Sequence, residues 1–307
     1  MRRLLVMLPL LSCATTRLPE TERRTTPPRR FALASSEPRR VVVVDGVSLA
    51  LHDSAPDSNK PVLLCLHAIG HGGGDFAAVV AAFSNDFRVI TLDWPGQGAS
   101  GDDVQPASAV RYTTLLEGVV QQLGVTKLVL LGNSIGGAVA IEYASRHPSE
   151  VRGLIIANPG GLDPGGFIAR LFIGNLEAHF HDGVEGVASF KPWFTKYYDG
   201  ILVTDAAKGR KALIVDAAWE SAPILEQAWH SFAQPEADLR AKAKTLSMPV
   251  FVAWAAKDEL IQWSRNREAV EAIPHVKVVQ FEAGHAPFLE TPEAFVPEAR
   301  AFLSRLP

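Results

Sequence analysis

The feature that most constrains this fold is a glycine-rich segment, GNSIGG at 132–137, set between two apolar runs. The run LVLL at 128–131 is typical of a buried strand, and AVAIEY at 138–143 continues as a helix. A tight strand-to-helix turn lifts its central side chain above the sheet, and glycines two residues before and after leave room for that turn. The following helix directs its N-terminal N–H groups at the same place. The pattern therefore predicts a nucleophile at Ser134, the alternative being a glycine-rich turn with an incidental serine.

Apolar runs alternate with helical patterns along most of the chain. An Asp-Gly turn at 45–46 predicts a hairpin over 41–51. Apolar runs predict strands at 61–66, 87–92, 127–131, 151–157, 249–255 and 276–281, and helical spacing appears at 112–123 and 292–303. This order predicts an α/β fold, a mostly parallel, doubly wound sheet of about eight strands with right-handed crossovers. Ligands of such sheets bind beyond the carboxyl ends of the strands.

One section interrupts this alternation. Residues from about 160 to 247 are rich in Phe, Trp and Tyr but contain no run typical of a buried strand. We expect a helical cap, inserted between strands six and seven of a domain that spans 41–307. It would cover the strand ends as a lid, or merely add core.

A serine hydroxyl needs a base, and a histidine base needs a carboxylate that fixes its tautomer. Among nine histidines, His285 alone stands just after a predicted final strand, in the segment AGHAPFLE at 283–290. Asp258 follows the strand 249–255, with Glu259 as its nearest competitor. The order Ser134, Asp258, His285 is the order of the α/β-hydrolase triad.

These residues resemble those of the α/β-hydrolase superfamily, and the resemblance covers essentially all of 41–307. The segment LHAIG at 66–70 resembles the family's H-G-x-G loop, and DWPGQGAS at 93–100 is similar to its D-x-P-G-x-G-x-S segment. The resemblance implies an oxyanion hole formed by the backbone N–H groups of Ile69 and Ile135. Ala68 departs from the usual glycine, which an alanine can replace if its φ is negative. Serine at 134 argues against the epoxide hydrolase and dehalogenase branches, which carry Asp there.

The resemblance favours hydrolysis of a carboxylic ester or related acyl compound through an acyl-enzyme. Cleavage of a carbon–carbon bond in a β-diketone-like compound, or acyl transfer to peroxide, uses the same triad and stays open. A non-catalytic binding protein is the third alternative, because fold does not imply function. The expected partner is a small acyl substrate, and no metal or organic cofactor is expected.

The first 40 residues differ from the rest of the chain. Arg2 and Arg3 precede the apolar run 4–11, and LLSC at 10–13 resembles a bacterial lipobox, in which Cys13 is acylated. The Thr-, Pro- and Arg-rich stretch that follows predicts a disordered tether up to about residue 40. We therefore expect an exported or membrane-anchored lipoprotein. The alternatives are a transit peptide or a poorly ordered N-terminus of a cytoplasmic protein.

Charge supports this division. Residues 1–40 hold nine Arg and three Glu, a net +6, so the remainder carries −9 of the overall −3. An acidic body repels phosphates, which argues against nucleic acid as a partner.

Overall fold

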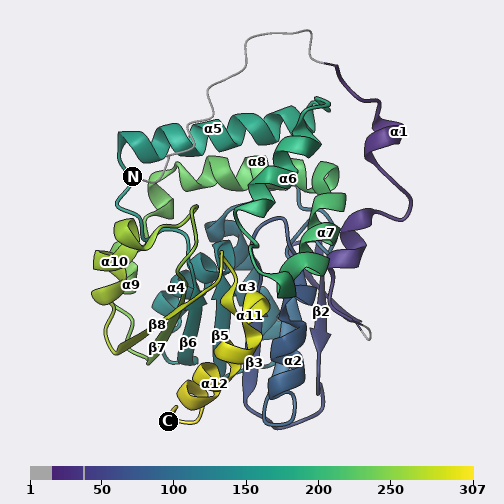
Figure 1. The fold of residues 1–307 in the computed structure, drawn as a ribbon. Helices are drawn as coiled ribbons and strands as arrows, with labels where there is room; N and C mark the ends of the chain where they lie inside the picture. The colour runs from purple at the N-terminus through teal and green to yellow at the C-terminus, as the bar shows by residue number, and fades with distance from the viewer. Residues whose placement is uncertain (1–15, 37–38) are drawn as a thin grey trace.

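The computed structural model describes residues 16–36 and 39–307, which fold around one eight-stranded sheet (Figure 1). The strand order is β1-β2-β4-β3-β5-β6-β7-β8, with antiparallel pairing of β1 with β2 and of β2 with β4. The remaining neighbours pair in parallel. The strands are β1 (Arg39–Val44), β2 (Val47–Asp53), β3 (Val62–Leu66), β4 (Arg88–Leu92), β5 (Leu128–Asn133), β6 (Val151–Ala157), β7 (Val250–Ala255) and β8 (Val276–Phe281). The predicted α/β fold is confirmed.

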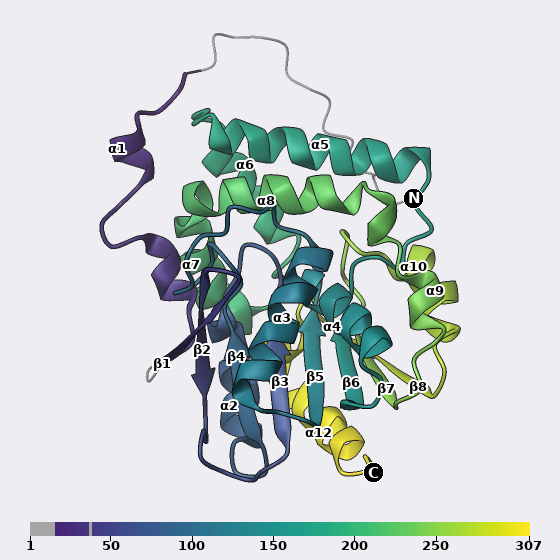
Figure 2. The same cartoon turned by 180° about the vertical axis from the view of Figure 1, so that it is seen from behind.

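Helices cover both faces of this sheet. One face carries α2 (Ala77–Phe83) and α12 (Pro292–Leu303), and the other carries α3 (Ala109–Leu123) and α4 (Ile135–Arg146) (Figures 1 and 2). Two further helices, α10 (Trp263–Glu271) and α11 (Pro287–Glu290), follow β7 and β8. Helices on both faces explain why β3 and β5 are buried along their whole length.

Local sequence sets several of these boundaries. Asp45 and Gly46 adopt φ values of 49° and 80°, as the tight turn between β1 and β2 requires. Ser108 caps α3 by accepting a hydrogen bond from the Arg111 backbone N–H, and Gly124 ends that helix at φ 63°. Cys65 is fully buried in β3, and burial raises the pKa of its thiol.

The stretch between β6 and β7 consists of helices and loops that form a layer over one end of the sheet (Figures 1 and 2). Its two long helices, α5 and α8, lie side by side. We call this layer the cap. Its helices are α5 (Phe167–Val184), α6 (Phe190–Asp199), α7 (Lys208–Asp216), α8 (Ala218–Phe232) and α9 (Arg240–Ala243).

The N-terminal segment 16–36 makes defined contacts, which corrects the expected disordered tether for these residues. We call this segment the strap; it includes α1 (Glu20–Arg23). Leu33 is buried, and the backbone N–H groups of Arg29 and Arg30 donate to the carboxylate of Glu220 on α8 at 3.0 and 2.9 Å. Tertiary partners on the cap therefore order a segment whose own composition is polar.

The lipobox-like residues, Cys13 included, lie outside the described residues. Within the described ranges, no helix combines the length and apolar character needed to cross a bilayer.

Candidate active site

Ser134 occupies the turn between β5 and α4 with φ 54° and ψ −118°, a conformation that non-glycine residues rarely adopt. Its backbone N–H donates to Ala157 O at 3.1 Å, and its carbonyl accepts from the Gly160 N–H at 3.1 Å. A methyl group on Gly132 would collide with the Gly136 carbonyl oxygen, and one on Gly136 would collide with that of Leu66. The two glycines are thus required by close backbone approach, and the surroundings hold Ser134 in its strained geometry.

Asp258 and His285 meet beyond the carboxyl ends of β7 and β8. Asp258 Oδ2 lies 2.6 Å from His285 Nδ1, with both residues buried. The other oxygen, Asp258 Oδ1, accepts the backbone N–H groups of Leu260 and Ile261 at 2.8 and 2.9 Å. Glu259 points to solvent. Of the two predicted carboxylates, Asp258 is therefore the one in contact with the imidazole.

Asn158 orients Asp258 from the end of the neighbouring strand. Its Nδ2 donates to Asp258 Oδ2 at 2.6 Å, and its Oδ1 accepts the Ala255 backbone N–H at 2.7 Å. Asn158 itself has φ 39° and is completely buried. The carboxylate oxygen that contacts His285 is thus fixed by a second donor.

Two buried side chains hold the backbone of the His285 loop. Glu290 Oε1 accepts the consecutive N–H groups of Gly284, His285 and Ala286 at 2.9, 2.8 and 3.0 Å. Asn133, directly before Ser134, donates from Nδ2 to His285 O at 3.0 Å. This bond ties the His285 loop to the Ser134 turn.

Electrostatics favour a protonated His285. Burial alone lowers the pKa of an imidazole, but the Asp258 charge and hydrogen bond outweigh it, with a smaller contribution from Glu290. The net effect raises the pKa of His285 above its ordinary value. An imidazolium stabilised in this way can store a proton during a reaction.

The loop after β3, expected to supply one oxyanion donor, is held by polar contacts. His67 Nε2 accepts the Trp94 N–H at 3.0 Å, and burial lowers the pKa of His67 to about 3, so its ring is neutral. The Gly70 N–H donates to Gln97 Oε1 at 2.6 Å. Among the described residues, positive φ at non-glycine positions occurs at Asp45, Ser134, Asn158 and His275 only. Ala68 is therefore accommodated without that strain.

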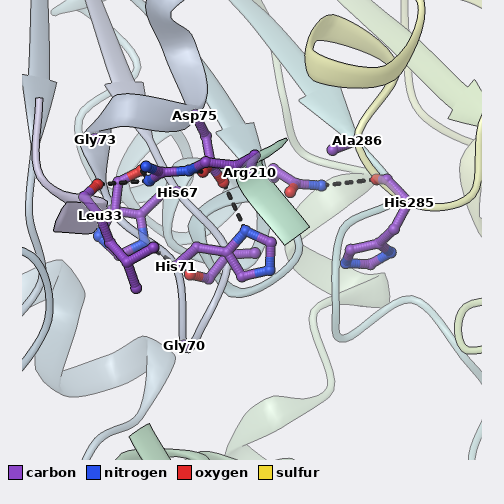
Figure 3. A network of polar contacts seen from close by, with 12 residues as sticks. Leu33, His67, Gly70, His71, Gly73, Asp75, Arg210, His285 and Ala286 are labelled. Atoms are coloured by element: carbon purple, nitrogen blue, oxygen red, sulfur yellow. Dashed lines mark hydrogen bonds and ion pairs between the residues drawn. The ribbon is translucent and has the colours of Figure 1, made fainter. Parts of the chain in front are cut away.

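The same loop continues into a buried ionic cluster. His71 Nδ1 lies 2.6 Å from Asp75 Oδ2, and Arg210 Nε on α7 donates to Asp75 Oδ1 at 2.5 Å (Figure 3). Arg210 also donates to Leu33 O in the strap and to Gly72 O. The cluster joins the loop after β3, the cap and the strap.

The cap encloses the candidate catalytic residues. Ser134 and His285 are only 6% and 2% exposed. A methyl group on Gly70 would lie 3.2 Å from the Leu225 side chain and 3.3 Å from the Tyr198 hydroxyl, so α8 and α6 lie directly over this loop. Burial raises the pKa of the nearby Tyr197 hydroxyl, and the Asp258 charge adds to that rise. Aromatic side chains that carry hydroxyl groups therefore lie beside the candidate site.

Other features of the described chain do not compete with this site. A surface hollow beside Lys127, Arg152 and Met248 lies at the opposite, amino-terminal ends of the strands. Over residues 16–36 and 39–307, no group of three or more His, Cys, Asp or Glu is placed to hold a metal ion.

The three predicted triad residues lie where the sequence places them, at the carboxyl ends of strands. Ser134, Asp258 and His285 all lie just beyond carboxyl ends of strands, and Asp258 and His285 are in direct contact. Ile69 and Ile135 are buried in adjacent segments, since Gly136 touches the end of β3. The roles of all five residues, as nucleophile, carboxylate, base and oxyanion donors, stay predictions. Sequence reasoning missed three buried residues that position them: Asn133, Asn158 and Glu290.

The chain belongs to a known family. Residues 61–292 match the family described as alpha/beta hydrolase fold, and this range includes β5, β7, β8 and the cap. The chain is therefore an α/β hydrolase.

Curated relatives of the chain carry names of hydrolases. It is 26% identical over 250 residues to a protein named "Putative carbamate hydrolase RutD" from Cronobacter sakazakii, covering 78% of this chain and 90% of that one. It is 34% identical over 132 residues to a 2-hydroxy-6-oxononadienedioate/2-hydroxy-6-oxononatrienedioate hydrolase from Burkholderia vietnamiensis, covering 41% and 46%. The solved enol-lactonase of Burkholderia xenovorans superposes with a TM-score of 0.74 at 20% identity, over 87% of this chain and all of that one.

Proposed function

We propose that this enzyme is a serine hydrolase of a carboxylic ester or related acyl compound. The observation that carries the proposal is the pairing of two features. Ser134 is held at φ 54° at the start of α4, and His285 contacts Asp258 at 2.6 Å on the loop that Asn133 ties to the Ser134 turn. A positioned hydroxyl, a base and an orienting carboxylate are the parts that acyl transfer needs.

In the proposed reaction, Ser134 Oγ attacks the substrate carbonyl carbon while His285 Nε2 accepts the hydroxyl proton. The backbone N–H groups of Ile69 and Ile135 stabilise the oxyanion, each worth about 3 kcal/mol. His285 then protonates the leaving group, which leaves an ester on Ser134. Water, deprotonated by His285, attacks that ester and releases the acid.

Two variants test the assignment. We expect Ser134→Ala and Asp258→Asn each to lower kcat on short acyl esters by about 10⁴-fold. Ser304→Ala, an exposed serine near the C-terminus, is the matched control and should keep full activity. A fluorophosphonate should label the wild type and the control but not Ser134→Ala. Turnover retained by Ser134→Ala would overturn the proposal.

Cleavage of a carbon–carbon bond is the second candidate. It is favoured by the 34% identity, over 132 residues, with a relative named 2-hydroxy-6-oxononadienedioate/2-hydroxy-6-oxononatrienedioate hydrolase. A substrate panel separates the two, with short acyl esters in one arm and dienoate diketones in the other. The higher kcat/KM identifies the reaction, and Ser134→Ala should abolish it in either case.

We further propose that the chain is exported and anchored through an acylated Cys13. The support is the Arg2-Arg3 start, the apolar run 4–11 and the LLSC segment. Mass analysis of the mature N-terminus tests this, because acylation predicts a chain that begins at a lipid-modified Cys13. A chain that still begins at Met1 would exclude it.

A further inference from the structure

Exposed large apolar side chains gather at one end of the cap. Phe167, Ile168, Leu171 and Phe172 are 76%, 72%, 59% and 43% exposed, and all lie in the first two turns of α5. At 100° per residue they share one side of the helix. We call these four residues the α5 patch. Clustered exposed apolar side chains mark interaction surfaces, whereas scattered ones do not.

The surroundings of the α5 patch suit a lipid surface. Residues 164–176 contain no Asp or Glu, and the one charged side chain there is Arg170, which is exposed. A long basic side chain can keep its charge at the headgroups while its stem lies along apolar surface. Aromatic and aliphatic residues beside a basic one are typical of helices that lie in a membrane interface.

The start of the strap, where it follows residues 1–15 (the leader), is bonded to the cap. Thr16 O accepts the Ala188 N–H, and the Leu18 N–H donates to Gly186 O, both at 2.8 Å, just past the end of α5. Cys13 precedes Thr16 by three positions in the sequence, and three positions of chain reach about 10 Å at most. A lipid on Cys13 would therefore keep Thr16, and with it the chain just past the end of α5, near the bilayer.

We propose that the cap docks on a lipid bilayer through the α5 patch. The 18 residues of α5 span about 27 Å, with the patch at its start and the leader's attachment just past its end. If the patch and the lipid on Cys13 both contacted the bilayer, α5 would lie along the membrane surface. The cap that encloses Ser134 would then face lipid. The orientation rests on the proposed Cys13 anchor, whereas the patch stands on its own exposure.

Vesicle flotation tests the patch without the anchor and without turnover. The full chain carrying Cys13→Ser is the parent, mixed with phosphatidylcholine vesicles. The patch variant adds Phe167→Ser, Ile168→Ser and Leu171→Ser. The control variant instead adds Val41→Ser, Val43→Ser and Val104→Ser, three residues that are 60%, 54% and 102% exposed but lie on β1 and a loop before α3. The leader is identical in all three chains, so its own lipid affinity cancels.

We expect the control variant to partition like the parent and the patch variant to partition at least tenfold more weakly. A decrease of less than threefold, or an equal decrease in the control, overturns the proposal. Circular dichroism of each variant establishes that it is folded.

A second measurement distinguishes other occupants of the patch. An environment-sensitive dye on Ile168→Cys, in the Cys13→Ser parent, should shift to the blue only when vesicles are added. A dye already shifted without vesicles would mean that a second copy or the leader's own apolar run covers the patch. Either result overturns docking on lipid.

Discussion

Glu290 Oε1 accepts the backbone N–H of His285 at 2.8 Å, and the same carboxylate reaches into the cap. Its other oxygen, Oε2, accepts the Val203 N–H at 2.8 Å, and Thr204 Oγ1 donates to Glu290 O at 2.9 Å. One buried residue thus fixes the candidate base and a cap loop together. Its charge also contributes to the raised pKa of His285.

Replacing Glu290 with Gln removes that charge and should lower the pKa of His285. The base is then active at lower pH, so the acid limb of the kcat/KM profile shifts toward lower pH. The plateau should fall about tenfold or more, because the loop loses part of its support. The measurement is a pH profile on a short acyl ester, with Glu293→Gln, an exposed neighbour, as the control. An unshifted acid limb would show that Glu290 has no electrostatic role.

The substitution Asn158→Asp should move the same limb in the opposite direction. It replaces a donor to Asp258 Oδ2 with a second carboxylate. The added negative charge raises the pKa of His285. As the pH is lowered, activity is therefore lost at a higher pH than in the wild type. We expect kcat to fall by at least tenfold, since Asp258 loses a hydrogen bond that orients it. Asn175→Asp, on the exposed surface of α5, is the matched control. A shift to lower pH would contradict this account.

Asp93 should make stability depend on pH. Burial raises the pKa of this carboxyl to about 6, although the Ala99 and Gly73 N–H groups lower it. An unfolded chain releases this proton near pH 4, before the folded one, so the contribution is complete below about pH 4 and is lost as pH rises through 6. The loss amounts to about 3 kcal/mol of unfolding free energy. The free energy of unfolding, measured in urea between pH 4 and 7, should therefore fall by this amount in the wild type relative to Asp93→Asn. An equal dependence on pH in the two proteins would exclude this role of Asp93.

Glu220→Ala should release the strap from α8. The variant loses the acceptor of the Arg29 and Arg30 N–H groups, at a local cost of about 1–3 kcal/mol. We expect faster amide exchange at these two residues and faster tryptic cleavage after them. The control is Glu226→Ala. Glu226 lies on α8 like Glu220 but bonds to His181 of α5, so this variant should leave both rates unchanged. Equal cleavage rates in wild type and Glu220→Ala would show that the strap is held elsewhere.

The sheet and the positions of Ser134, Asp258 and His285 could be predicted because each depends on local pattern. A buried strand is an apolar run, and a residue just after such a run lies at the ligand-binding end of a parallel sheet. Asp258 and His285 are 27 residues apart, yet the neighbouring strands β7 and β8 bring them to 2.6 Å.

The supporting residues could not be predicted in the same way. Asn158 is a single polar residue after β6, and its importance depends on the partner it meets 100 residues later. A polar residue directly after a buried strand is a signal, but many such residues only face solvent. Glu290 stands five residues after His285 with no motif to identify its role.

The strap was missed because its order comes from distant partners. Its sequence is rich in Pro, Thr and Arg, which alone cannot bury apolar surface. Yet Arg30 donates to Ser100 O in the core and Arg210 donates to Leu33 O, so both the sheet domain and the cap hold the segment. Local composition reports nothing of such contacts.

The strap bonds to both the cap and the core, through Glu220 on α8 and through Ser100 O. It lies outside the residues 61–292 that match the family. Lifting α8 away from the Ser100 loop therefore means breaking bonds made by a segment that takes no part in the chemistry. Any movement of the cap away from the core therefore depends on residues 16–36 as well as on the cap's own contacts. An α/β hydrolase without such a segment would lack these bonds, even if the loops around its candidate site were identical to those of this chain.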